Sequence, residues 1–183
     1  MYGTAFNVFA IEEDCIIYGP GIRTVIWFQG CSIRCPGCWN KNMWSTEPSI
    51  LMERMDLLDI ILKSAHGVTF LGGEPLDQHD NLLWLLQRLG GKNIEMMLYT
   101  GYEEQEIDSN PAFREICDIP KILVTGRYRA EERDTDLTWR GSRNQHITIK
   151  GTIEVPLDSN HVEIRINEDG SVTYMGYPDE FMN

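Results

Sequence analysis

Short apolar runs bounded by glycine or proline recur along the chain. Residues 5–12 and 22–28 are rich in β-prone apolar side chains and flank the turn Gly19-Pro20-Gly21. Such runs are typical of buried strands that end at tight turns. Three more runs of the same kind predict strands, at residues 68–71, 94–99 and 122–125.

The stretches between these runs have helical periodicity. Residues 49–65 place four apolar side chains on one helical face. Residues 80–89 show similar spacing and end at Gly90-Gly91, a typical helix stop. Residues 103–117 predict a third helix, interrupted at Asn110-Pro111 because proline breaks the helical hydrogen-bond pattern. The apolar face of the first helix comprises Leu51, Met55, Leu58 and Leu62.

Strands that alternate with helices predict an α/β fold with a mostly parallel sheet. The carboxyl ends of parallel strands meet at one edge, where ligands bind. Three segments follow directly after predicted strands: the cysteine-rich loop, Gly72-Gly73-Glu74 and Thr100-Gly101-Tyr102. We therefore expect these segments to converge on one site.

The tail of the chain has a different pattern. Apolar and polar side chains alternate over residues 162–166 and 172–174, on either side of the turn Glu168-Asp169-Gly170. This pattern predicts a β-hairpin, and since an isolated hairpin is marginally stable we expect it to pack on the exposed edge of the sheet. We accordingly divide the chain into a main part, residues 1–150, and a C-terminal β-hairpin extension of the same domain, residues 151–183. The extension is expected to shape partner choice rather than catalysis.

Charge narrows the set of partners. The 183 residues include 16 basic and 28 acidic side chains, a net charge of −12. Nucleic acids and anionic membrane surfaces attract basic proteins, so neither is an expected partner.

The N-terminus lacks signal-peptide features, and no apolar stretch reaches the roughly 18 to 20 residues that span a bilayer. We expect a cytoplasmic protein, whose clustered cysteines serve as metal ligands or catalysts.

Three of the five cysteines, Cys31, Cys35 and Cys38, lie in one short loop. Thiolates at this spacing can ligate three irons of a 4Fe–4S cluster and leave the fourth iron open to substrate. The alternative, a structural zinc ion, normally has four protein ligands in paired elements, and no histidine pair here matches the triplet. Cys15 and Cys117 are isolated, and we interpret them as small buried apolar residues rather than a fourth ligand.

The CxxxCxxC motif is the signature of the radical S-adenosylmethionine (SAM) superfamily. The further motifs make the chain similar to the glycyl-radical-enzyme activases, in particular to the activating proteins of anaerobic ribonucleotide reductase. Two features depart from that family. Thr125 stands where the family usually has aspartate, and this chain continues to Asn183, whereas short family members nearly end at the "NQ" segment, residues 144–145 here. The matching segments are GPGIR (19–23), QGC (29–31), CPGCWNK (35–41) with Trp44, LGGEPL (71–76), YTGY (99–102), LVTGRY (123–128) and LTWRGSRNQ (137–145).

The resemblance implies a fold, a mechanism and cofactors. The fold is expected to be a partial (βα)6-type radical SAM barrel. One 4Fe–4S cluster and SAM are expected as cofactors, with flavodoxin or ferredoxin as the low-potential electron donor. Reductive cleavage of SAM gives methionine and a 5′-deoxyadenosyl radical, which generates a glycyl radical on a protein partner like anaerobic ribonucleotide reductase. The protein supplies position, a low cluster potential and exclusion of water.

The resemblance also assigns residues to SAM. Gly72-Gly73 lets the backbone approach the methionyl end without steric cost, although alone it also fits a turn after a strand. Glu74 is expected to accept a hydrogen bond from the methionyl ammonium group. Gly37 stands where many related enzymes carry an aromatic residue beside the adenine, so its backbone and the side chain of Trp39 are the expected contacts, although Trp39 also fits core packing. Thr100, after its strand, is the remaining expected contact.

A loop rich in both charges lies between residues 127 and 143. Interleaved arginines and acids are typical of a solvated, self-neutralising loop. Trp139 and Arg140, however, are residue types enriched at binding hot spots, and with Asn144 and Gln145 they are the candidate partner contacts. Two other functions stay open: a radical enzyme that modifies a peptide or small molecule directly, and a non-catalytic iron–sulfur or zinc module.

Overall fold

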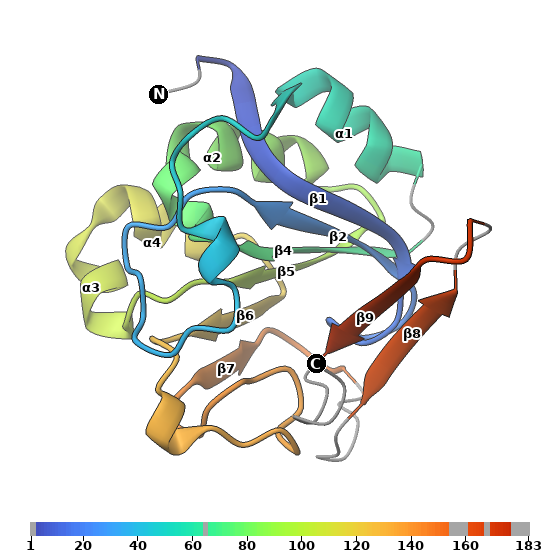
Figure 1. The fold of residues 1–183 in the computed structure, drawn as a ribbon. Helices are drawn as coiled ribbons and strands as arrows, with labels where there is room; N and C mark the ends of the chain where they lie inside the picture. Colours follow the sequence, from blue (N-terminus) through green and yellow to red (C-terminus); the bar gives the residue numbers. More distant parts are fainter. Residues whose placement is uncertain (1–2, 64–65, 154–160, 167–168, 177–183) are drawn as a thin grey trace.

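The computed structural model describes residues 3–63, 66–153, 161–166 and 169–176 (Figure 1). A seven-stranded sheet has the strand order β3-β1-β2-β4-β5-β6-β7, and a separate two-stranded sheet is formed by β8 and β9. The strands are β1 (Ala5–Cys15), β2 (Arg23–Phe28), β3 (Ile50–Glu53), β4 (Gly67–Gly72), β5 (Glu95–Tyr99), β6 (Ile122–Thr125), β7 (His146–Ile149), β8 (Val162–Ile166) and β9 (Val172–Gly176). The α-helices are α1 (Arg54–Lys63), α2 (His79–Leu89), α3 (Glu104–Ser109) and α4 (Pro111–Cys117), and 3-10 helices cover Lys41–Met43, Pro75–Gln78 and Ala130–Glu132.

The centre of the large sheet is parallel and its outer parts are antiparallel. Strands β2, β4, β5 and β6 run parallel, whereas β1, β3 and β7 each pair antiparallel with their neighbours. A parallel pair needs a long crossover connection, but β1 and β2 are joined only by residues 16–22 and therefore form a hairpin. The predicted α/β fold with a mostly parallel central sheet is confirmed, with antiparallel strands added on both sides.

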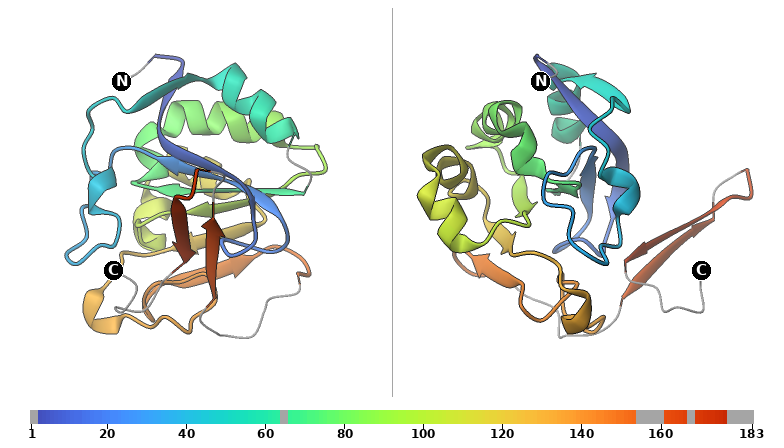
Figure 2. Two further views of the ribbon diagram at one scale, coloured as in Figure 1. Left: turned by 45° about the vertical axis from the view of Figure 1, so that its right-hand side comes forward. Right: turned by 60° about the vertical axis from the view of Figure 1, so that its left-hand side comes forward.

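The large sheet separates two cores. Helices α1 to α4 lie together on one side of it, as the two views in Figure 2 show. Strand β2 is fully buried, and its alternate side chains belong to different cores. Phe28 packs on the helical side, where it stacks with Phe6 and Phe70 at centroid distances of 5.4 and 6.3 Å. Trp27 packs on the other side, which holds the hairpin and a cavity.

The segment predicted as one helix over residues 49–65 is a strand followed by a helix. Ile50–Glu53 pairs with the start of β1, and α1 begins only at Arg54. Pairing with a neighbouring strand thus overrides the local helical pattern. The predicted apolar face is also shifted, because α1 buries Leu57, Leu58 and Ile61 while Leu51, Met55 and Leu62 are exposed.

The predicted break at Asn110-Pro111 is confirmed. Helix α3 ends at Ser109 and α4 begins at Pro111, a first-turn position where proline's missing N–H breaks no helical hydrogen bond. The Asn110 side chain accepts hydrogen bonds from the N–H groups of Ala112 and Phe113 at 3.1 and 3.4 Å, which caps α4.

In the described ranges no helix has both the length and the apolarity needed to cross a bilayer.

The tail forms the predicted hairpin, but at a different place. Strands β8 and β9 pair antiparallel from Val162 opposite Gly176 to Ile166 opposite Val172. The hairpin packs against the segment that joins β1 and β2, through hydrogen bonds to Ile16 and Tyr18 (Figure 2). The edge strands of the large sheet are β3 and β7, so the expectation that the hairpin covers a sheet edge is wrong.

A buried arginine ties together the strand ends opposite the cysteine loop. Arg23 is 1% exposed and reaches Glu95 of β5 at 3.1 Å and Thr69 of β4 at 2.9 Å. Gly19 and Gly67 make room for it, because a Cβ at these positions would lie 2.1 and 2.5 Å from the guanidinium nitrogens. In this chain the GPGIR motif therefore has a structural role, at the opposite strand ends from the cysteine loop.

Arg23→Met is expected to lower the free energy of unfolding by about 3 kcal/mol, because it removes the buried partner of Glu95. Urea unfolding measures the loss. Lys121→Met is the matched control, since Lys121 contacts the same carboxylate at 3.3 Å but is itself 39% exposed. Its removal is expected to change stability by less than about 1 kcal/mol. Equal losses in the two variants would contradict the role assigned to Arg23.

Candidate active site

One large cavity opens at the carboxyl ends of the parallel strands. It has a volume of about 720 Å³ and is bounded by the loop after β2, the ends of β4 and β5, the loop after β6, and the hairpin. The structure brings the predicted segments together here. The cavity lining includes Cys31, Cys35, Cys38, Gly72, Gly73, Glu74, Thr100 and Gly101.

The loop that carries the cysteines is fixed by hydrogen bonds to its own far end and to the segment after β4. The N–H of Gly30 donates to the carbonyl of Met43 at 2.9 Å, and the N–H of Cys31 donates to the carbonyl of Trp44 at 3.4 Å. Asp77 accepts hydrogen bonds from the N–H and the hydroxyl of Ser32, both at 2.7 Å. The positions of the thiols therefore depend on the surrounding fold and not on the loop alone.

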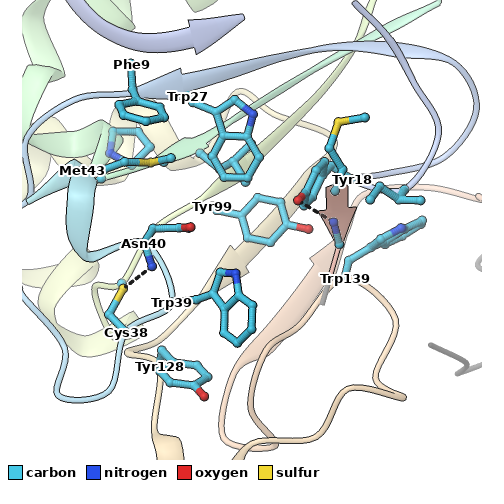
Figure 3. A pocket seen from close by; sticks show the side chains of 18 of the residues that line it. Phe9, Tyr18, Trp27, Cys38, Trp39, Asn40, Met43, Tyr99, Tyr128 and Trp139 are labelled. Atoms are coloured by element: carbon cyan, nitrogen blue, oxygen red, sulfur yellow. Dashed lines mark hydrogen bonds between the residues drawn. The ribbon is translucent and has the colours of Figure 1, made fainter. Parts of the chain in front are cut away.

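Backbone N–H groups approach all three thiols. One loop N–H lies 3.5 Å from Cys31 Sγ, and that of Asn40 lies 3.4 Å from Cys38 Sγ (Figure 3). Burial raises the pKa of the Cys31 and Cys35 thiols, and the N–H of Tyr128 acts on Cys35 in the opposite direction. Metal binding releases the thiol protons, and such N–H donors stabilise the resulting thiolates and tune a cluster's potential.

The donor set fits a cluster of several metal atoms better than a single ion. A zinc site needs all its ligands about 2.0–2.3 Å from one atom, whereas in a cubane cluster each thiolate binds its own iron. Three soft sulfur donors on one loop beside a cavity therefore fit a 4Fe–4S cluster.

The glycines at the end of β4, Gly72 and Gly73, allow close packing of the backbone. Gly72 has a φ of +116°, and a Cβ there would lie 2.4 Å from the backbone nitrogen of Phe28. A Cβ on Gly73 would lie 2.0 Å from the carbonyl oxygen of Gly30. Hydrogen bonds of 2.8 Å run from Gly73 N to Phe28 O and from Glu74 N to Gly30 O. The pair thus seats the end of β4 against the start of the cysteine loop, a role that the sequence reasoning missed.

Glu74 joins the ends of β4 and β5. Its carboxylate accepts hydrogen bonds from the Thr100 hydroxyl at 2.8 Å, the Gly101 N–H at 2.9 Å and the Leu76 N–H at 3.0 Å. A carboxylate has about four acceptor positions, so these donors leave one for a ligand. Burial raises the pKa of Glu74, which is 1% exposed, to about 7 despite the three hydrogen bonds.

Aromatic side chains from separate elements point into the cavity (Figure 3). Trp39 is in the lining, 40% exposed, with the Arg133 guanidinium 5.1 Å from its ring centroid. Gly37 is not in the lining: its φ is +74°, and a Cβ there would lie 2.7 Å from the Cβ of Ala130. Tyr99 and Tyr128 were missed as site residues, although they stand in the YTGY and LVTGRY motifs. Other aromatic lining residues that the sequence did not indicate are Phe9, Tyr18, Trp27 and Tyr174.

Two of the four candidate partner contacts line the cavity. Trp139 and Gln145 are in its wall, whereas Arg140 and Asn144 are not. The Asn144 side chain donates to the carbonyl of Arg127 at 2.8 Å, and the Gln145 side chain accepts a hydrogen bond of 2.8 Å from the loop backbone. These amides therefore shape the loop after β6, and Trp139 and Gln145 are the members of the set placed to meet a ligand.

Neither isolated cysteine lines the cavity. Cys15 is 0% and Cys117 is 3% exposed. Burial raises the pKa of Cys15 to about 11 and that of Cys117 to about 12. Both thiols therefore stay protonated at neutral pH, in agreement with their interpretation as small buried side chains.

Comparison with known proteins agrees with this geometry. A family described as a 4Fe-4S single cluster domain matches residues 17–148. The anaerobic ribonucleoside-triphosphate reductase-activating protein of Escherichia coli (strain K12) is 36% identical over 143 residues, which cover 71% of this chain and 90% of the relative. Proteins of the same name from Haemophilus influenzae and Enterobacteria phage T4 are 32% and 30% identical; each match covers 72% of this chain, and 90% and 86% of the relatives. The chain therefore belongs to the family of anaerobic ribonucleoside-triphosphate reductase-activating proteins, with the cysteine triplet of the radical SAM superfamily.

Proposed function

We propose that this protein activates an anaerobic ribonucleotide reductase by generating a glycyl radical on it. The proposal is carried by one observation: the cysteine triplet and the ends of β4 and β5 share a cavity in a chain of the activating-protein family. The relatives' names supply the reductase as partner. Direct modification of a peptide or small molecule has no comparable support.

We infer that the fold is a partial (βα)6 barrel of the radical SAM type. The four parallel strands, with cofactor residues at their carboxyl ends, support this assignment. Residues 1–150 form the radical SAM domain in this proposal, and residues 151–183 are an extension of it. We propose that the enzyme works without oxygen and that its location is the cytoplasm.

In this proposal Cys31, Cys35 and Cys38 hold the 4Fe–4S cluster. SAM binds in the cavity, with Glu74 and Thr100 as polar contacts and Trp39 as an aromatic contact. Gly72, Gly73 and Gly37 offer backbone groups, and Gly37 also lets the cysteine loop pack on Ala130. The chemistry that the bound cluster and SAM supply is reductive cleavage to methionine and a 5′-deoxyadenosyl radical, which takes a hydrogen atom from the reductase glycine.

The chain's own residues position and protect this chemistry. The N–H donors around the thiols stabilise the thiolate form of the cysteines. Glu74 holds the ends of β4 and β5 at a fixed separation. Apolar and aromatic side chains in the wall, such as Trp27, Leu71 and Tyr99, exclude water from the cavity. Trp139 and Gln145 are the proposed contacts of the incoming reductase segment, and the electron donor is a flavodoxin or ferredoxin.

The proposal is tested by activation of the reductase. The anaerobically reconstituted protein, SAM and a low-potential reductant are incubated with the reductase of the same organism, and ribonucleoside triphosphate reduction is then measured. We expect turnover only when all components are present. SAM cleavage that never activates the reductase, but alters a peptide or small molecule instead, would refute the proposal.

Binding of SAM is expected to strengthen as pH rises through about 7. The Glu74 carboxyl, with its pKa raised to about 7 by burial, must lose its proton before it can accept the methionyl N–H. Below that pKa, affinity is expected to fall by up to about tenfold per pH unit. The SAM-induced change in the spectrum of the reduced cluster, titrated at several pH values, measures this dependence.

Two variants isolate the contribution of Glu74. Glu74→Gln is expected to remove this part of the pH dependence and leave only the part due to the amino group of SAM. Thr100→Val keeps the carboxyl but removes a hydrogen bond that lowers its pKa, so the midpoint is expected to move to higher pH. An identical pH profile in wild type and Glu74→Gln would rule out contact between Glu74 and SAM.

A further inference from the structure

The hairpin turns its apolar face away from the protein. Residues that oppose each other across β8 and β9 lie on the same face of the hairpin. Glu163 and Met175 oppose each other and lie on the inner face, which packs against the protein. Met175 is 4% exposed and packs in the core that contains Trp27 and Leu71. The outer hairpin face consists of Val162, Ile164, Ile166, Val172 and Tyr174, of which the last four are 50, 79, 44 and 49% exposed.

Polar contacts fix this orientation. The Glu163 carboxylate accepts a hydrogen bond from the N–H of Ile16 at 3.1 Å, and Gly176 N donates to the Tyr18 hydroxyl at 2.8 Å (Figure 3). Glu163 also pairs with Arg165 at 2.7 Å on the inner face. Because the charged residues of β8 point inward, the five described residues of the outer hairpin face include no charged side chain.

The outer hairpin face continues the wall of the cavity. Val162 and Tyr174 belong both to this face and to the cavity lining. Ile16, which is 60% exposed, also lines the cavity. Figure 2 shows the hairpin projecting from the body of the protein. The apolar surface therefore leads from the solvent to the mouth of the cavity.

The position of this face identifies its occupant. A contiguous exposed apolar surface marks an interaction site. Anything that covers it lies at the cavity mouth, through which the glycine of the reductase must enter. A second copy of the chain would block this mouth and would bring together two proteins of net charge −12. The hairpin also lies outside residues 17–148, the part of the chain that matches the family model. A segment outside the shared part is better placed to select a partner than to carry out the chemistry that the family shares.

We propose that the outer hairpin face docks an extended apolar segment of the reductase and guides the adjacent glycine-bearing loop into the cavity. The proposal rests on the proposed function above. Apolar side chains of the segment would lie on Ile164, Ile166 and Val172 and bury the apolar surface that these residues expose. Docking of this kind places the glycine without adding any group to the catalytic cavity.

The test uses Ile164→Glu and Ile166→Glu, which put a charge on the face but lie outside the cavity lining. Met55→Glu is the matched control for Ile164→Glu, because Met55 on α1 is an apolar residue of similar exposure, 54% against 50%. Three quantities are measured for each anaerobically reconstituted protein: its dissociation constant for the reductase, the glycyl radical yield, and SAM cleavage without reductase. Sedimentation reports the oligomeric state.

We expect the hairpin variants to raise the dissociation constant at least about tenfold and to lower the radical yield, because a charge is forced into an apolar contact. SAM cleavage without reductase is expected to stay at the wild-type level, and Met55→Glu to behave as wild type throughout. Unchanged affinity for the reductase, or a wild-type dimer that the variants dissociate, would overturn the docking proposal. A wild type that binds the reductase but places no radical on it would overturn the proposed function alone.

Discussion

Replacing any one of Cys31, Cys35 and Cys38 by alanine is expected to abolish SAM cleavage completely. Each thiolate binds its own iron in a cubane cluster, so two remaining ligands cannot hold it. Neither Cys15 nor Cys117 lines the cavity to replace the lost ligand. Iron and sulfide analysis together with 5′-deoxyadenosine formation measures the loss, which is expected to bring both to the background level.

The two isolated cysteines supply the controls for this experiment. Cys15→Ala and Cys117→Ala are expected to keep the cluster and the cleavage activity, because both thiols are buried side chains of the two cores. Loss of the cluster on changing Cys117 alone would contradict the assignment of three ligands. Stoichiometric zinc with no sulfide in the wild type would contradict the cluster itself.

Gly73→Ala is expected to cause both iron loss and weak SAM binding. The new Cβ would lie 2.0 Å from the carbonyl oxygen of Gly30 and 3.0 Å from that of Met43, which are both backbone atoms. The start of the cysteine loop must then move, at a cost of about 3 kcal/mol in stability. This differs from the simpler expectation that a side chain here would only fill the space of the methionyl group.

Iron content and the free energy of unfolding, measured on the same preparation, test the effect of Gly73→Ala. Gly91→Ala is the control, because Gly91 lies after α2 with a φ of +79° and no atom within 4 Å of an added Cβ. It is expected to lose about 1 kcal/mol through backbone strain and to keep its iron. A Gly73→Ala protein with full iron content would show that the close contact with Gly30 is not needed for the cluster.

The site could be largely predicted from the sequence because its parts are local. Cysteine spacing is a property of one loop, and the convergence of the cysteines, Gly72-Gly73-Glu74 and Thr100 follows from the geometry of parallel strands. What the sequence could not give is the packing between these segments. Position 73 has no room for a side chain because the carbonyl of Gly30 lies close to it, and position 37 has none because Ala130 does. Both neighbours are distant in sequence, so no local pattern identifies them.

Two errors about the fold have the same physical origin. Residues 50–53 have a helical pattern but pair with β1, since the free hydrogen-bonding edge of that strand decides their conformation. In the hairpin, alternation shows which side chains share a face, but not which face packs inward. Here the inner face is chosen by Met175 and by the contacts of Glu163 with the β1–β2 segment, 147 residues away in sequence.

The most direct test of the account is electron paramagnetic resonance of the reductase after incubation with this protein. The reaction contains the reconstituted and reduced protein, SAM and the reductase, under strict exclusion of oxygen. We predict a glycyl radical doublet on the reductase, accompanied by formation of 5′-deoxyadenosine, and neither signal with Cys35→Ala. Steady SAM cleavage with no doublet on the reductase, or a doublet that forms without SAM, would contradict the central claim.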